Sequence, residues 1–438
     1  MRRQTLWIAM ACSIATIGAT STYAGFVEDS QVQLKFKNFY LDRQYDDTPA
    51  KNWGSWSQAV TLDAKSGYAE FGALQLGVDV LAQYAVRLDG RDRNADWVLP
   101  YSGVSGTGTG KQERQFGKIG ATFKAKISQT ELRIGEILPV TPVIHFDPSR
   151  QLLTTYNGIW LESKDLENTK LTLGYLDSIN ARYENQPMDF GLWPKALNND
   201  GKTDGMYVAG IDYQLNKNWS ASYFYGDVTN IYRQNYLGVN YKNNYDKLKV
   251  DSHIRFFDNA ESGDALYGDI DNQALSIGST LTYGSHSVGL SYQQMFGDHG
   301  SNPSAATGAP YFPSLAGWVP QPYLDNWSVA SFIRKDEKSV GVAYSYDFSD
   351  LGIKGLKTTA KYWHGWGIDS AYESSALTGK GKGKEDEFNF ILNYVVPEGK
   401  FKGLGFQWMY IDVNFDNIAG QASDLQEHRI ATTYTYKF

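Results

Sequence analysis

The chain ends with the stretch RIATTYTYKF at positions 429–438, and this stretch decides the fold class. The residues at 430, 432, 434, 436 and 438 are aliphatic, aromatic or β-branched, whereas those between them are small, polar or charged. A period of two is the pattern of a β-strand with one apolar and one polar face. The same alternation recurs in three further segments, at 404–410, 388–394 and 340–348.

Across the whole chain, eighteen segments show this pattern, which is an even number. Some connections are short, as at 216–218 and 284–285, whereas others are long and rich in Gly, Ser and Asp, as at 89–111 and 298–334. Short turns on one rim and long loops on the other are typical of outer-membrane barrels. We therefore predict an all-β protein, a transmembrane antiparallel β-barrel of about 18 strands with short periplasmic turns and long extracellular loops. A soluble secreted all-β protein is the alternative.

The composition agrees with a barrel and excludes other classes. The chain is 14% aromatic, with 30 Tyr and 43 Gly, and its single Cys excludes a disulfide framework. Beyond residue 24 no stretch approaches about 18 consecutive apolar residues, so no membrane-spanning helix is expected. In lipid every backbone polar group needs a partner, and a closed sheet supplies one without leaving free edges.

The first 24 residues are predicted to be a removable signal peptide. Arg2 and Arg3 precede a short apolar run, and the small residues up to Ala24 fit a cleavage site. A lipoprotein acceptor at Cys12 is the alternative, but the residues after it stay apolar. Cleavage leaves 39 of the 41 basic residues against 48 acidic ones, a net charge of −9, which disfavours nucleic acid as a partner. We expect one barrel over residues 25–438.

Several stretches, in chain order, resemble a known family. They lie at 26–30, 37–43, 126–132, 138–150, 271–276, 289–293 and 346–356. These stretches resemble the OprD (Occ) family of substrate-specific porins, and the most specific are Ser-Gln-Thr-Glu-Leu at 128–132 and Asp-Pro-Ser-Arg at 147–150. The resemblance implies a monomeric barrel whose third loop, here 138–156, folds into the pore. It also implies passage of small carboxylate-bearing nutrients, including amino acids, along a ladder of basic side chains.

The alternation indicates which basic residues face the lumen. Leu132 and Ile134 are placed toward lipid, so Arg133 between them faces inward. The basic residues that we expect on the pore path from their strand positions are Arg43, Lys126, Arg133, Arg255, Lys361 and Arg429. A lumenal arginine can bind a carboxylate bidentately, but it can equally be a structural partner in a salt bridge. Both interpretations are open for each residue.

The predicted loop 138–156 is the other candidate element, because its prolines keep it from continuing the strand ladder. Ser149, Arg150 and Tyr156 border the narrowest part of the pore in one interpretation, as donors for a carboxylate. In the other, Asp147 and Arg150 pin the loop to the wall.

The chain departs from the family pattern on the penultimate strand. Arginine-transporting members are expected to place several inward arginines there, whereas this chain has Gly405, Gln407, Met409, Asp412 and Asn414. The long extracellular loop predicted at 298–334 offers only Asp298 and Asp325 for a substrate's positive group. The resemblance therefore implies passage of small carboxylates, but not of basic amino acids specifically.

No catalytic residue, cofactor or metal site is predicted, because the six His lack metal-binding spacing. An outer-membrane enzyme is disfavoured, since a barrel hydrolase needs a nucleophile beside a positioned His. The stronger alternative is a general or sugar-type porin with weak selectivity. The expected partners are outer-membrane lipid and lipopolysaccharide, which the lysine-rich run at 379–384 could contact. Small solutes are expected to pass through the pore, and carbapenem-type antibiotics are candidate solutes. We expect a monomer or loose trimer in the outer membrane of a Gram-negative bacterium.

Overall fold

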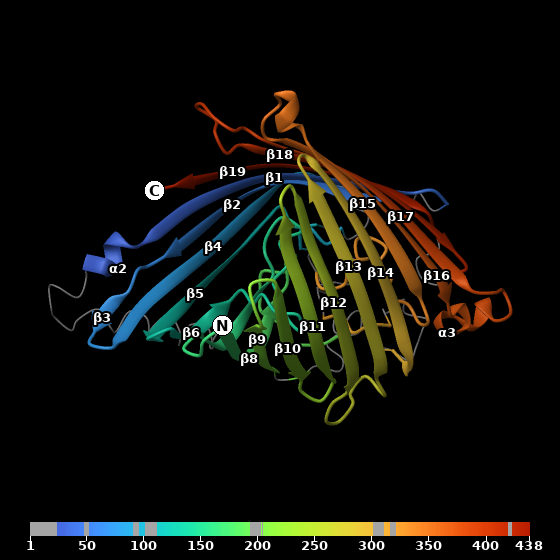
Figure 1. Ribbon diagram of the computed structural model, residues 1–438, viewed down its shortest axis with the longest axis horizontal. Helices are drawn as coiled ribbons and strands as arrows, with labels where there is room; N and C mark the ends of the chain where they lie inside the picture. The colour runs from blue at the N-terminus through green and yellow to red at the C-terminus, as the bar shows by residue number, and fades with distance from the viewer. Residues whose placement is uncertain are drawn as a thin grey trace.

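The computed structural model describes residues 24–47, 52–90, 96–100, 112–192, 203, 205–300, 311–315, 321–418 and 423–438. In this part of the chain nineteen strands form a single antiparallel sheet (Figure 1). The predicted signal peptide lies almost wholly outside the described residues, and its cleavage stays a prediction.

The strands are, in chain order, β1 (Gln31–Tyr45), β2 (Trp53–Lys65), β3 (Ala69–Phe71), β4 (Leu74–Gly90), β5 (Gln115–Ile127), β6 (Thr130–Ile137), β7 (Thr155–Ser163), β8 (Thr169–Asn180), β9 (Met206–Gln214), β10 (Trp219–Val228), β11 (Tyr232–Tyr245), β12 (Leu248–Glu261), β13 (Asp271–Tyr283), β14 (His286–His299), β15 (Lys338–Asp347), β16 (Leu356–Ile368), β17 (Gly383–Val395), β18 (Gly405–Asp416) and β19 (Leu425–Lys437). The described helical segments are α2 (Ala24–Glu28), η4 (Phe348–Leu351), α3 (Ser370–Glu373) and η5 (Ser375–Leu377).

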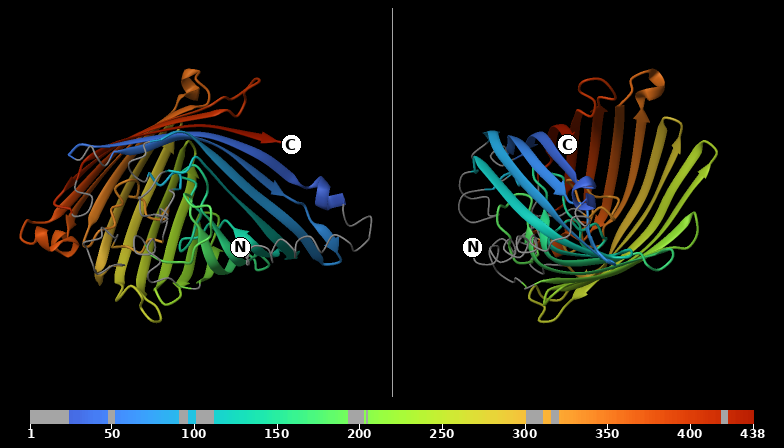
Figure 2. Two further views of the ribbon diagram at one scale, coloured as in Figure 1. Left: turned by 180° about the vertical axis from the view of Figure 1, so that it is seen from behind. Right: turned by 90° about the vertical axis from the view of Figure 1, so that its left-hand side faces the viewer.

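The sheet closes on itself because the first and last strands pair. The register of β1 with β19 runs from Gln33 opposite Lys437 to Tyr45 opposite Leu425. The three-residue β3 pairs with β4, so eighteen full strands form the barrel wall of the described chain. This confirms the predicted barrel and its strand number. Figure 2 shows the strongly tilted wall from two further sides, with several connections running inside it.

Side-chain burial follows the predicted alternation. On β14, Leu290 is 59% exposed on the outer face, whereas Gln293 is fully buried toward the lumen. On β12, Ile254 is 55% exposed and Phe257 is fully buried beneath the inward-folded connections. An outward leucine and a buried inward glutamine reverse the pattern of a soluble protein, as expected for a wall that contacts lipid.

Three connections, at 138–154, 181–192 and 321–337, pack inside the barrel. Their buried residues Ile144, Phe190 and Ile333 belong to one apolar cluster with the wall residues Trp160 and Phe257. Fully burying such a side chain contributes roughly 1.5–3 kcal/mol each, so the loops are held as part of a core. The lumen is therefore partly filled, and the open passage is narrower than the eighteen-stranded wall.

Some loop boundaries differ from those predicted. Because β7 begins at Thr155, the end of the predicted loop 138–156 belongs to the wall. The long loop predicted at 298–334 runs from 300 to 337, since β14 continues to His299 and β15 starts at Lys338. The strand β3 was not predicted, because three residues are too few to show a period of two. No helix of the described chain is long and apolar enough to cross a membrane.

The outward face of β13 provides a test of the lipid-facing assignment. Replacing Ile277, at the middle of this strand, with Arg should lower the folding free energy in lipid vesicles by about 2–4 kcal/mol. The same change at Leu281, on the same face but near the periplasmic turn, should cost about 0–1 kcal/mol. Denaturant titrations of folding into vesicles measure both, and equal costs would contradict the assignment.

Candidate functional site

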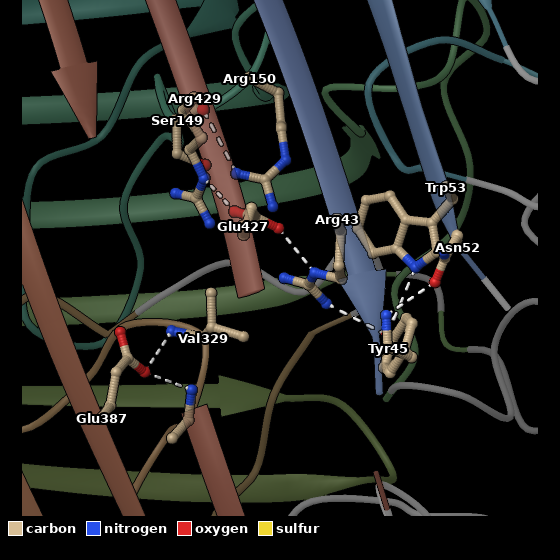
Figure 3. A network of polar contacts seen from close by, with 11 residues as sticks. Arg43, Tyr45, Asn52, Trp53, Ser149, Arg150, Val329, Glu387, Glu427 and Arg429 are labelled. Carbon is tan, nitrogen blue, oxygen red and sulfur yellow. Dashed lines mark hydrogen bonds and ion pairs between the residues drawn. The ribbon is translucent and has the colours of Figure 1, made fainter. Parts of the chain in front are cut away.

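Three arginines surround one carboxylate inside the barrel. We call Arg43, Arg150, Arg429 and Glu427 the arginine cluster; Figure 3 shows the three guanidinium groups gathered around Glu427. The Nε atom of Arg43 donates to Glu427 Oε2 at 2.6 Å, and Arg429 Nε donates to Glu427 Oε1. Glu427 is fully buried, so both ion pairs lie in a region of low dielectric. The cluster contains three guanidinium groups and one carboxylate, so it has an excess of two positive charges.

The sheet register brings the wall members of this cluster together. Arg43 lies opposite Glu427 in the pairing of β1 with β19, and Arg429 follows two positions later on the same face. Arg43 also stacks on Trp53 of β2, with its guanidinium carbon 4.3 Å from the ring centroid. The ladder that closes the barrel therefore also builds this part of the site.

Arg150 reaches the cluster from the connection 138–154, which is tied down at both sides. Asp147 accepts a hydrogen bond from Arg182, which follows β8. On the opposite side, Lys37 of β1 donates to the backbone carbonyl of Arg150, and Gln151 Nε2 donates to the carbonyl of Lys37 at 3.0 Å. The connection thus crosses part of the lumen between β6 and β1.

The electrostatics of this connection differ between its two charged residues. Burial raises the pKa of Asp147, but Arg182 and the hydrogen bonds from Ser149 outweigh that effect, so the pKa lies below its ordinary value. Burial, with the positive charges of Arg429 and Arg182, lowers the pKa of Arg150 well below its usual value. Arg150 Nε has no hydrogen-bond partner among the described residues. An anion beside Arg150 would satisfy this donor and reduce the repulsion.

Acidic side chains of the wall hold the segment 321–337. Glu387 accepts from the backbone N–H of Val329 at 3.0 Å and of Ala330 at 2.6 Å (Figure 3). Glu385 accepts from the backbone N–H of Phe332 at 2.7 Å and from Arg334 Nε at 2.9 Å. These carboxylates of β17 therefore act as anchors for the loop backbone.

Asp325 forms a second anchor on the other side of the lumen. Its Oδ2 lies 2.6 Å from His253 Nε2 and accepts from Ser276 Oγ at 2.8 Å, while Arg255 Nη1 is 3.7 Å from Oδ1. Burial raises the pKa of Asp325, but His253, Ser276 and Arg255 outweigh it, and the pKa lies below its ordinary value. The carboxylate is thus already neutralised by wall residues.

The two inward segments meet and leave a cavity on their periplasmic side. Gln321 Nε2 donates to the carbonyl of Pro142 at 2.8 Å, which links 321–337 to 138–154. A cavity of about 690 Å³ lies below this link, lined by Pro142, Tyr323 and residues of the short turn after β7. It connects the loop-narrowed region with the rim that carries the short turns.

The chain matches a family model described as outer membrane porin, OprD family, over residues 24–438. It belongs to the OprD family of porins. The porin-like protein GalP of Pseudomonas putida is 27% identical over 414 residues, which cover 94% of this chain and 92% of that protein. The solved structure of OccAB2 of Acinetobacter baumannii is 32% identical, with a TM-score of 0.83 and coverage of 95% of this chain and 100% of that one. OpdK of Pseudomonas aeruginosa, solved with vanillate, is 26% identical, with a TM-score of 0.82 and coverage of 94% and 100%.

As an OprD-family porin, the protein is a non-enzymatic channel of the Gram-negative outer membrane. The family resemblance inferred from the sequence is confirmed. No group of three His, Cys, Asp or Glu side chains that could hold a metal ion occurs within the described ranges.

The structure separates the predicted pore residues into different environments. Arg43, Arg150 and Arg429 come together, whereas Arg133 is bound on the wall by Glu131 at 2.5 Å and Glu162 at 2.7 Å. Arg255 lies beside the Asp325 anchor. The remaining predicted basic residues stand over aromatic rings, Lys126 over Tyr68 at 5.7 Å and Lys361 over Trp363 at 5.5 Å.

Two predicted assignments were wrong. Tyr156 does not border the passage, because it is fully buried in the apolar cluster and donates its hydroxyl to the carbonyl of His145. On β18, Asp412 and Asn414 face outward, and the inward positions are Ile411 and Val413, both fully buried. These two residues pack in one cluster with Phe332 of the inward segment, so an apolar face was required where polar residues were expected.

Sequence reasoning missed Glu427, Lys37, Arg182 and Glu387. Period-two parity placed Glu427 on the inward face beside Arg429, and this signal was available in the sequence. Arg182 lies between the predicted strands, and nothing in its local pattern indicates that it binds Asp147.

Replacing Glu427 with Gln should shift the porin's reversal potential toward anions, because the arginine cluster loses its only negative charge. Leaving the buried Arg43 and the partly buried Arg429 without a counter-charge should also cost about 3–5 kcal/mol of stability. Planar-bilayer recordings under a salt gradient measure the shift. The matched control is Glu162→Gln, which removes a carboxylate shared by Arg133 and Lys170, and an equal shift in both variants would refute the cluster's role.

Replacing Asp325 with Asn should loosen the segment 321–337 and increase open-channel current noise. Because the folded-state pKa of Asp325 is depressed, its anchoring is present at neutral pH and is lost as the pH falls through that folded pKa. The wild-type noise should therefore rise on acidification, whereas the variant should be noisy throughout. Asp298→Asn, an exposed position beside the same loop, is the control and should behave like the wild type.

Proposed function

We propose that this porin admits small organic carboxylates and guides them past the arginine cluster. The observation that carries the proposal is the excess of guanidinium groups, three around the one carboxylate of Glu427, with Arg150 Nε unsatisfied within the described chain. A carboxylate can bind a guanidinium through two parallel hydrogen bonds, which lowers the cost of removing its hydration shell in a narrow passage.

Apolar packing beside the cluster fixes the orientation of one of its guanidinium groups. Arg43 lies on the ring of Trp53, and Trp53 packs in one buried cluster with Leu41 and Leu152. An arginine stacked on an aromatic ring has its planar fork of donors held in place, ready for a carboxylate. The similar channel OpdK was solved with vanillate, an aromatic carboxylate, and we extend that solute class to this chain as part of the proposal.

The acidic residues favour carboxylates without a cationic group. Asp325, Glu385 and Glu387 already accept hydrogen bonds from wall or loop groups. A substrate ammonium or guanidinium group would have to displace those partners. We therefore propose simple carboxylates as better solutes than basic amino acids.

The test compares two lumenal arginines on the wall. Arg429→Gln should weaken current block by vanillate about fivefold, which corresponds to roughly 1 kcal/mol. Arg133→Gln should change it less than twofold, because Arg133 is already paired with Glu131 and Glu162. Block is measured in planar bilayers at several vanillate concentrations, with arginine as a second solute.

Equal effects of the two substitutions would remove the arginine cluster from the solute path. A wild-type channel that no carboxylate blocks would instead support a general or sugar-type porin, for which the periplasmic cavity, lined by residues of both charges and by polar side chains such as Gln129, Asn168 and Ser222, is suited.

A further inference from the structure

Strands β15, β16 and β17 are neighbours in the barrel wall (Figure 1), and basic residues lie on their outer face at their extracellular ends. Lys338 is the first residue of β15, Lys384 is the second of β17, and both pair in register with Trp366 of β16. The adjacent residues Ser339 and Glu385 are fully buried toward the lumen, so the two lysines point outward. We call Lys338, Trp366 and Lys384 the outer basic patch.

The two lysines of this patch are not engaged in ion pairs with the carboxylates near them. Lys338 and Lys384 are exposed, and neither makes an ion pair with any residue that the structure describes. Asp386 lies two residues after Lys384 on the same face of β17. Its carboxylate accepts hydrogen bonds from Tyr362 Oη at 2.6 Å and from His364 Nδ1 at 2.7 Å. Asp416, the cross-strand neighbour of Lys384, is exposed and forms no ion pair with it.

The charges around the patch differ from those at other strand ends. Lys382, just before β17, is 59% exposed and forms an ion pair with Asp336 at 3.5 Å, so the uncompensated positive charge at this edge is that of Lys338 and Lys384. In contrast, acidic residues occupy outward positions toward the extracellular ends of three other strands, namely Asp258 on β12, Asp271 on β13 and Asp412 on β18. A localised basic sector on a chain with a net charge of −7 indicates an anionic partner at this place.

The position of the patch identifies the chemistry of that partner. A tryptophan at the outer end of a barrel strand lies at the headgroup level of the membrane. Basic residues clustered at that level attract anionic lipid headgroups, and a lysine ammonium binds phosphate as a point charge. We propose that the outer basic patch binds the phosphorylated sugar headgroup of lipopolysaccharide, with Lys338 and Lys384 on phosphate and Trp366 against the sugar and acyl boundary.

The test uses purified full-length barrel and bis-phosphorylated lipid A in detergent micelles. The variant Lys338→Gln/Lys384→Gln should raise the dissociation constant for lipid A about tenfold or more. The matched control Lys400→Gln/Lys402→Gln removes two exposed lysines from the periplasmic turn between β17 and β18, and it should change the constant less than twofold. Dephosphorylated lipid A should bind the wild type as weakly as lipid A binds the double variant.

Unchanged lipid A affinity in the double variant, or an equal loss in the periplasmic control, would overturn the proposal. Heat-modifiable gel migration and single-channel conductance report folding and channel function separately, and both should stay at wild-type values. If the double variant does not fold, Lys384→Gln alone and the salt dependence of wild-type binding serve instead. Lipid A binding that does not weaken with added salt would also refute the assignment.

Discussion

The pairing of β1 with β19 is the constraint on which the rest of this porin depends. In lipid, an unpaired strand edge would leave a row of backbone groups without partners, so the sheet must close. Closure in one register determines which residues of every strand face lipid and which face the lumen, because a shift of one residue would exchange the two faces. The same ladder places Arg43 opposite Glu427, so the constraint that stabilises the wall also assembles the arginine cluster.

Inside that wall, ion pairs and apolar packing together determine the shape of the passage. The connection 138–154 is held through Asp147 and Arg182, and the segment 321–337 is held through Glu385, Glu387 and Asp325. These anchors use carboxylates and leave guanidinium groups in excess near Glu427. The electrostatic preference of the pore thus follows from how its loops are fastened as well as from the number of basic residues. Buried apolar clusters then fill a further part of the lumen beside these anchors.

The strand positions could be predicted well because period two is a local property. The inward directions of Arg133, Arg255 and Arg429 followed from the alternation of their neighbours, and the structure has them so. The error on β18 has a definite cause. Asp412 and Asn414 are polar and were assigned to the lumen, but Ile411 and Val413 face inward because a loop segment far away in sequence covers them. The prediction that Tyr156 borders the pore was wrong for the same reason, because packed loops and not an open pore surround this side chain.

The sequence by itself determined the barrel, its strand number and, apart from the extracellular half of β18, the face on which the assigned wall residues lie, because alternation along a strand is set by neighbours one and two positions away. Only the tertiary structure decided the partner of each charged side chain. Arg133 and Arg429 have the same parity and the same chemistry, yet one is paired with two glutamates and the other belongs to a cluster with excess positive charge. That difference arises from cross-strand register and from loops crossing the lumen, which bring together residues hundreds of positions apart, such as Arg43 and Glu427.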